Sequence, residues 1–156
     1  MTLIQKTSGY FNSFDGTRIY YETRGTGKPL IFVYGIACLM NHWHPQLSEF
    51  SRSYQTIAFD FRGHHFSEVP ENKKNLSIEA LAKDIICLCE HLQIDKAVFL
   101  GHSFGNAVLV ESYFKKPELF AGTCLISSFF SSPFAHLISQ EQTTEAMNYV
   151  KKLYNV

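Results

Sequence analysis

The stretch Ala97-Val98-Phe99-Leu100-Gly101-His102-Ser103-Phe104-Gly105 decides which fold this chain adopts. Its first four residues are apolar and partly branched, which is typical of a short strand covered on both faces. Residues 106–114 then predict a helix that Pro117 stops. A serine between two glycines on a sharp strand-to-helix turn holds its hydroxyl clear of the backbone, as a nucleophile requires. The competing interpretation is a glycine turn whose serine only caps the helix.

Two other apolar runs precede this stretch and predict further strands. Residues 30–34 end in Gly35-Ile36, and residues 54–59 are followed by Asp60-Phe61-Arg62-Gly63-His64-His65-Phe66-Ser67. Between these two runs, a helix that packs on the sheet is predicted from Trp43, Pro45, Leu47 and Phe50.

The remaining predicted elements alternate in type along the chain. They are strands at 10–14, 19–23 and 124–127 and helices at 77–91 and 140–154. Asp15-Gly16 is typical of a hairpin turn, and Ser77 is typical of a helix N-cap. The alternation implies an α/β fold with a mainly parallel sheet and a site at the carboxyl ends of its strands.

The order of these motifs resembles the α/β-hydrolase superfamily, particularly its epoxide hydrolase, haloperoxidase and C–C hydrolase-like branch. In that branch a strand ends in His-Gly, and a Trp, Asp-x-Arg-Gly-x-Gly-x-Ser and Gly-x-Ser-x-Gly follow. The resemblance covers about residues 10–133. It implies a three-layer α/β sandwich of the α/β-hydrolase type, truncated after about the sixth strand. Residues 1–133 are then the N-terminal part of the core, and residues 134–156 begin a cap helix.

Carried over residue by residue, the resemblance implies that Ser103 is the catalytic nucleophile. The backbone amides of Ile36 and Phe104 are then the two donors that bind the oxyanion. Asp60 and Arg62 are expected to hold loops together without taking part in the chemistry.

Two residues depart from the family pattern. Tyr34 stands where the family has the histidine before the oxyanion-loop glycine, and its hydroxyl is expected to replace part of the loop bracing. His65 stands where the family has the second glycine of the Arg-Gly-x-Gly turn. If that position needs a positive φ, a histidine adds strain that glycine avoids.

A serine nucleophile needs a base and an acid, and this sequence has neither at the place where the family has them. In this family the acid and then the histidine follow the serine in the chain. The histidine that follows Ser103 is His136, close to the sixth strand, and the candidate acids are Glu118, Glu141 and Glu145. We therefore expect this chain alone to be catalytically incomplete, with both triad partners in sequence beyond Val156.

Other classes of site are disfavoured. The pairs His42-x-His44 and His64-His65, and also His102, are interpreted as structural, so no metal is expected. Gly25-x-Gly27-Lys28 lacks the spacing of a phosphate loop, and no dinucleotide motif follows the first strand, so no cofactor is expected. The formal net charge of zero argues against nucleic acid as a partner.

The sequence also indicates the cellular compartment of the protein. No apolar run reaches membrane-spanning length, and residues 1–9 lack a signal-peptide core. The spacing of the four cysteines matches neither a zinc ribbon nor a redox motif, which predicts free thiols in a cytoplasmic protein.

The leading hypothesis is the N-terminal part of a serine hydrolase that acts on a carboxylic ester or a related small acyl substrate. Branches with an aspartate nucleophile are disfavoured because residue 103 is serine. The alternative is a non-catalytic or degenerate α/β-hydrolase-like protein with a binding or signalling role. The sixth strand, with Leu125 and Ile126, is expected to form an open sheet edge, which predicts self-association or a complementing C-terminal polypeptide.

Overall fold

A six-stranded sheet with helices on both sides forms the structure, a computed structural model that describes residues 6–128. In chain order its elements are β1 (Lys6–Asn12), β2 (Arg18–Arg24), β3 (Pro29–Val33), the 3₁₀ helix η1 (Met40–Trp43), α1 (His44–Phe50), β4 (Gln55–Phe59), η2 (Lys73–Asn75), α2 (Ile78–His91), β5 (Ala97–His102), α3 (Phe104–Lys115), η3 (Pro117–Leu119) and β6 (Phe120–Ile126).

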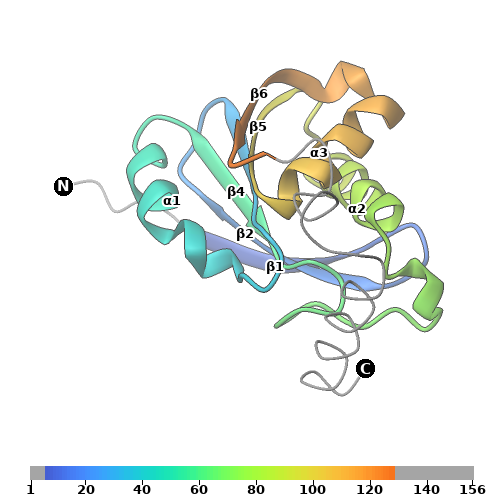
Figure 1. Cartoon of the computed structure of the whole chain (residues 1–156). Coiled ribbons are helices and arrows are strands. Elements are labelled where there is room, and N and C mark those ends of the chain that lie inside the picture. Colours follow the sequence, from blue (N-terminus) through green and yellow to red (C-terminus); the bar gives the residue numbers. More distant parts are fainter. Residues whose placement is uncertain (1–5, 129–156) are drawn as a thin grey trace.

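The strands lie in the order β1-β2-β4-β3-β5-β6. β1 pairs with β2 and β2 with β4 in antiparallel fashion, whereas β4, β3, β5 and β6 run parallel. α1 lies on one face of the sheet, and α2 and α3 pack together on the other (Figure 1). The expected three-layer α/β sandwich with a mainly parallel sheet is therefore confirmed.

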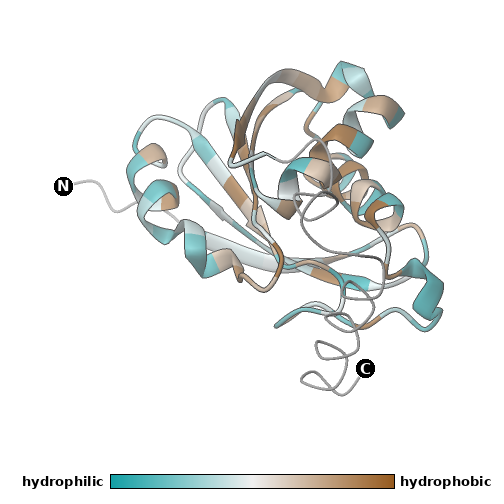
Figure 2. Cartoon of the chain, viewed as in Figure 1, coloured by the Kyte–Doolittle hydropathy of each residue, from teal (hydrophilic) through white to brown (hydrophobic). Residues whose placement is uncertain are grey.

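The apolar strand predicted at residues 30–34 is β3, which lies between β4 and β5. Leu30 to Val33 are all buried because α1 and α3 cover the two faces of the sheet here. Trp43 packs on Phe32 from the α1 side, with ring centroids 5.4 Å apart. Apolar residues concentrate in β5 and β6 and along α2 and α3, whereas hydrophilic residues cover η2 (Figure 2).

The helix predicted from Ser77 is α2, and its bounds agree with the sequence. Ser77 has extended backbone angles, and its hydroxyl accepts a hydrogen bond from Ala80 N at 3.2 Å, which satisfies one free amide of the first turn. Leu81, Ile85 and Leu88 lie on its buried face, as their helical spacing requires.

Other boundaries differ from the predictions. β1 is shifted toward the N-terminus and ends at Asn12, because the chain turns at Ser13, whose N–H donates to Thr17 O at 2.9 Å. The helix predicted around Trp43 is divided into η1 and α1. β6 begins at Phe120, four residues before the predicted start at 124, because its pairing with β5 already begins at Phe120 and continues through Gly122 and Thr123.

β6 pairs only with β5 among the described strands, as expected for an open edge. Ile126 at its end is 39% exposed. The predicted helix at 140–154, the cap at 134–156 and His136 lie outside the described residues. Within residues 6–128, every helix is too short or too polar to cross a bilayer.

Candidate active site

Ser103 occupies a strained turn between β5 and α3. Its φ of 52° and ψ of −117° lie in a region that residues other than glycine rarely adopt. Its N–H donates to Ile126 O at 3.0 Å, and its carbonyl accepts from Asn106 N at 3.0 Å. Both backbone groups are thus bonded, and the neighbouring strand and helix hold the serine in this conformation. The strand–turn–helix order predicted from the sequence is confirmed.

The two glycines around Ser103 allow backbone and side chains to approach closely. A Cβ on Gly105 would lie 2.5 Å from Val33 O and 2.6 Å from Tyr34 O. A Cβ on Gly101 would overlap Asn106 Oδ1 and lie 2.7 Å from Leu109 Cδ1. Because no carbon can occupy such positions, these glycines permit α3 to start directly against the ends of β3 and β5.

The residues predicted to bind an oxyanion lie on either side of this turn. Phe104 is the first residue of α3, so its N–H has no acceptor within the helix and lies at the positive end of the helix dipole. The Gly35-Ile36 loop passes over the serine, since a Cβ on Gly35 would lie 3.2 Å from Ser103 Cβ. Cys38 N donates to Gly35 O at 3.2 Å and closes the loop as a turn.

Tyr34 braces the loop that follows β4. Its side chain is fully buried, and its hydroxyl accepts a hydrogen bond from Phe61 N at 2.7 Å. Burial raises the pKa of Tyr34 far above its usual value, so the hydroxyl stays protonated. The hydroxyl thus holds the loop after β4, and its expected bracing of the Gly35-Ile36 loop stays a prediction.

Asp60 and His65 stabilise the same loop. The buried Asp60 carboxylate lies 3.1 Å from His65 Nδ1 and accepts a hydrogen bond from Phe66 N at 3.4 Å. Desolvation by burial raises the pKa of Asp60 above its usual value. His65 has a φ of 46°, so this position does adopt the positive φ that favours glycine.

Arg62 joins three parts of the chain and is buried by them. Its Nε and Nη2 donate to the Asp84 carboxylate of α2 at 2.7 and 2.6 Å, and its Nη1 donates to Asp15 of the β1–β2 hairpin at 2.8 Å. Ser13 donates a further short hydrogen bond to Asp84. Burial raises the pKa of Asp15, but hydrogen bonds from Arg62 and its other partners outweigh this and hold the pKa well below its usual value.

Sequence reasoning predicted that Asp60 and Arg62 hold loops together, but it missed Asp84 and Asn106. Asp84 had a signal, because it lies on the buried face of α2 among apolar residues. Asn106 is 3% exposed, and its Nδ2 donates to Ile126 O at 2.8 Å and Ser128 Oγ at 2.9 Å. These two bonds connect the end of β6 to the first turn of α3, beside Ser103.

The histidines near the turn stack on one another. The rings of His42 and His102 have centroids 5.4 Å apart and an interplanar angle of 20°, and Trp43 packs edge-on against His102. Within residues 6–128, neither a histidine nor a carboxylate forms a hydrogen bond with the Ser103 hydroxyl. Glu118 lies in η3 at the opposite end of β6. Glu141, Glu145 and His136 fall outside the described residues.

Metal binding has no support in the described part of the chain. No group of three or more histidine, cysteine or acidic side chains gathers there in a way that could hold a metal ion. His42 and His44, the pair with a possible chelating spacing, lie in η1 and at the start of α1.

A mainly parallel sheet with helices on both faces, and with a strained serine turn at the carboxyl end of the interior strand β5, defines the α/β-hydrolase class. The chain belongs to the alpha/beta hydrolase fold family, whose model matches residues 28–150.

Relatives of known activity support this assignment. Epoxide hydrolase 1 of Caenorhabditis elegans is 35% identical over 101 residues, which cover 64% of this chain and 25% of that protein. Non-heme chloroperoxidase of Streptomyces lividans is 35% identical over 101 residues, covering 63% of this chain and 36% of that protein. The chain thus matches only about a quarter to a third of the length of these relatives.

Solved structures show the same fold. Est816, described as an N-acyl homoserine lactone degrading enzyme, superposes with a TM-score of 0.79 at 26% identity, covering 90% of this chain and 52% of that one. Epoxide hydrolase VrEH1 from Vigna radiata superposes with a TM-score of 0.75 at 23% identity, covering 92% and 46%.

Proposed function

We propose that this chain carries the nucleophile and oxyanion site of a serine hydrolase that acts on carboxylic esters or related acyl substrates. The observation that carries the proposal is the strained backbone of Ser103 at the N-terminus of α3, which donates a hydrogen bond to β6 and accepts one from α3. Strain of this kind persists only where the surrounding structure enforces it, and it is concentrated at functional sites.

The chemistry follows from the arrangement of the turn. The Ser103 oxygen attacks the carbonyl carbon of the substrate, and negative charge develops on the carbonyl oxygen. The amides of Phe104 and Ile36 donate hydrogen bonds to that oxygen, and the helix dipole adds to the stabilisation. A base has to accept the serine proton during the attack. Without one, triad enzymes lose a factor of about 10⁴ to 10⁶ in rate.

Epoxide opening fits this chain less well, although several relatives are named epoxide hydrolases. An aspartate nucleophile forms an ester with the opened epoxide, and water then cleaves that ester. A serine at position 103 would instead form an ether, which water does not cleave under mild conditions. Acyl transfer gives an ester on Ser103 and avoids this dead end.

The second candidate is a non-catalytic binding or signalling protein with the same fold. It is favoured by one observation, namely that no described histidine or carboxylate is bonded to the Ser103 hydroxyl. The two candidates differ in one measurable property: a hydrolase site responds to an added base, and a degenerate site does not.

The test is labelling by a fluorophosphonate probe with imidazole added as an external base. We expect little labelling of the chain alone and an adduct at Ser103 whose rate of formation rises with imidazole concentration, as mass spectrometry of the peptides would show. Ser103→Ala abolishes the adduct, and Ser53→Ala, a change at an exposed serine outside the site, leaves it unchanged. A folded chain that imidazole does not activate would refute the hydrolase proposal.

A further inference from the structure

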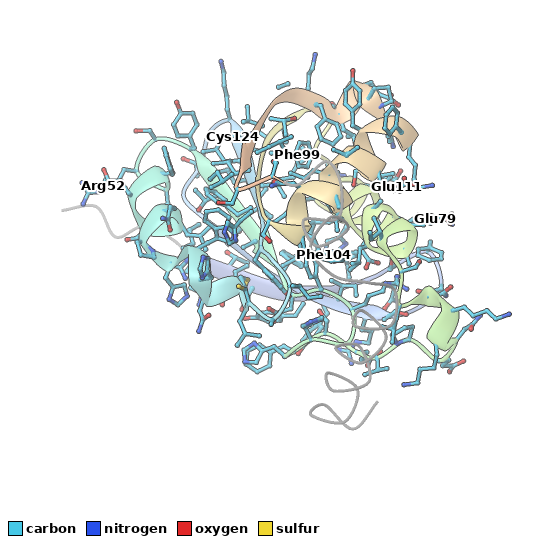
Figure 3. The ribbon with its side chains drawn as sticks, viewed as in Figure 1. Arg52, Glu79, Phe99, Phe104, Glu111 and Cys124 are labelled. Carbon is cyan, nitrogen blue, oxygen red and sulfur yellow. The ribbon has the colours of Figure 1, made fainter. Side chains whose placement is uncertain are left out.

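A cavity of about 320 Å³ opens beside the serine turn. Ile36 and Phe104, whose amides we assign to the oxyanion site, both line it. Figure 3 shows Phe104 at the start of α3, on the side of the sheet where Glu79 of α2 also lies and away from Arg52 of the α1 side. The cavity therefore continues from the reacting centre toward the start of α2.

The walls of this cavity are almost entirely carbon. Phe61 comes from the loop after β4, and Leu76, Ile78 and Leu81 come from the start of α2. Leu81 is 7% exposed and belongs to the core, whereas Leu76 and Ile78 are 50% and 39% exposed and form the mouth. The volume lies at the lower end of the range for small-molecule sites, which suits one alkyl chain or one ring.

The charged group in the wall is already neutralised. Arg62 lines the cavity, but its side chain is 1% exposed and its donors are bonded to Asp84 and Asp15. Two carboxylates face one guanidinium, so the cluster does not attract an anion. The Ser77 hydroxyl, also in the wall, is the cap of α2 and accepts from Ala80 N.

One polar ring remains in the lining. His64 Nδ1 lies 3.3 Å from Arg62 O, and the ring packs edge-on against Tyr34 and Phe61.

We propose that this cavity is the subsite for an uncharged alkyl or aryl group attached to the reacting carbonyl, and that it rejects anionic substituents. The inference rests on the proposed serine hydrolase function, because the oxyanion site is what places a carbonyl at the mouth. The proposed subsite restricts the expected substrates to neutral acyl compounds with an apolar substituent. A carboxylate or phosphate in this cavity would lose its hydration without gaining a cationic partner.

The subsite can be tested without catalysis. Octanamide, butanamide and octanoate are titrated at pH 8 into the full chain carrying Ser103→Ala, and binding is followed by amide chemical shifts. Octanamide should shift the amides of Ile36, Phe104 and Leu81, and its affinity should exceed that of butanamide by about fourfold per added methylene. Octanoate, which is ionised at this pH, should bind at least tenfold more weakly.

Two variants of similar exposure locate the binding. Leu76→Trp narrows the mouth and should weaken octanamide binding at least tenfold, whereas Val69→Trp, at a nearby exposed residue outside the lining, should change it less than twofold. If the Leu76→Trp variant does not fold, Ile78→Trp provides a second test because it also narrows the mouth of the cavity. Equal binding of octanoate, or insensitivity to the mouth variants, would overturn the subsite.

The hydrolase proposal and the subsite proposal can be refuted independently of each other. Labelling of Ser103 by an ethyl fluorophosphonate, together with no preference for the longer amide, would retain the nucleophile and overturn the subsite. Selective octanamide binding by a folded wild-type chain whose Ser103 is not labelled even with added imidazole would retain the subsite as a binding pocket and overturn the hydrolase proposal.

Discussion

Replacing Gly105 by alanine should disrupt the contact on which the serine turn depends. The new Cβ would lie 2.5 Å from Val33 O and 2.6 Å from Tyr34 O, about 1 Å closer than van der Waals contact allows. Both oxygens belong to the backbone at the end of the buried strand β3, so α3 has to move instead. Overpacking of a core costs about 1–3 kcal/mol, and rigid backbone on both sides predicts a value near the upper end.

Urea unfolding measures this cost. With a slope of about 2 kcal/mol per molar urea, a loss of about 3 kcal/mol lowers the unfolding midpoint by about 1.5 M. The matched control is Gly122→Ala on β6, where the nearest atom to a new Cβ is Val98 Cγ2 at 4.0 Å. This control should shift the midpoint by less than 0.3 M, as ~0.5 kcal/mol implies. Equal midpoints for the two variants would refute the packing argument.

Three further outcomes follow from the hydrogen bonds around the site. Tyr34→Phe removes the acceptor of the buried Phe61 N–H and should cost about 1–3 kcal/mol in thermal unfolding; an unchanged melting temperature would contradict it. Asp15→Asn should destabilise the chain most at neutral pH. The folded-state pKa of Asp15 lies below its unfolded value of about 3.9, so its contribution is present above that pH and is lost on acidification, and the difference from wild type should narrow below about pH 4. Asn106→Ala removes two hydrogen bonds to the end of β6 and should speed hydrogen exchange of the Ser103 amide by about tenfold, an increase that a rigid turn would not show.

The local features of the site could be predicted because neighbouring residues determine them. Ser77 caps α2 through an amide three residues away, and the apolar run before Ser103 with its two glycines determines the strand and the turn. The strain expected at His65 depended on whether that position needs a positive φ, and the structure shows a φ of 46° there.

Pairs that lie far apart in the chain could not be predicted in the same way. Arg62 was expected to hold loops together, but its partners Asp84 and Asp15 lie 22 and 47 residues away and are brought to it by α2 and the β1–β2 hairpin. The stacking of His42 on His102 likewise depends on how η1 crosses the end of β5. No local spacing encodes these distances, because the sheet order determines them.

The sequence by itself thus determined the types of the elements, the serine turn and the family, because helical and strand periodicity and turn chemistry act over a few residues. The tertiary structure decided the strand order, the neutralisation of Arg62 and the apolar cavity beside Phe104. These depend on contacts between segments distant in the chain, which form only when β3, β5 and α2 pack together and exclude water.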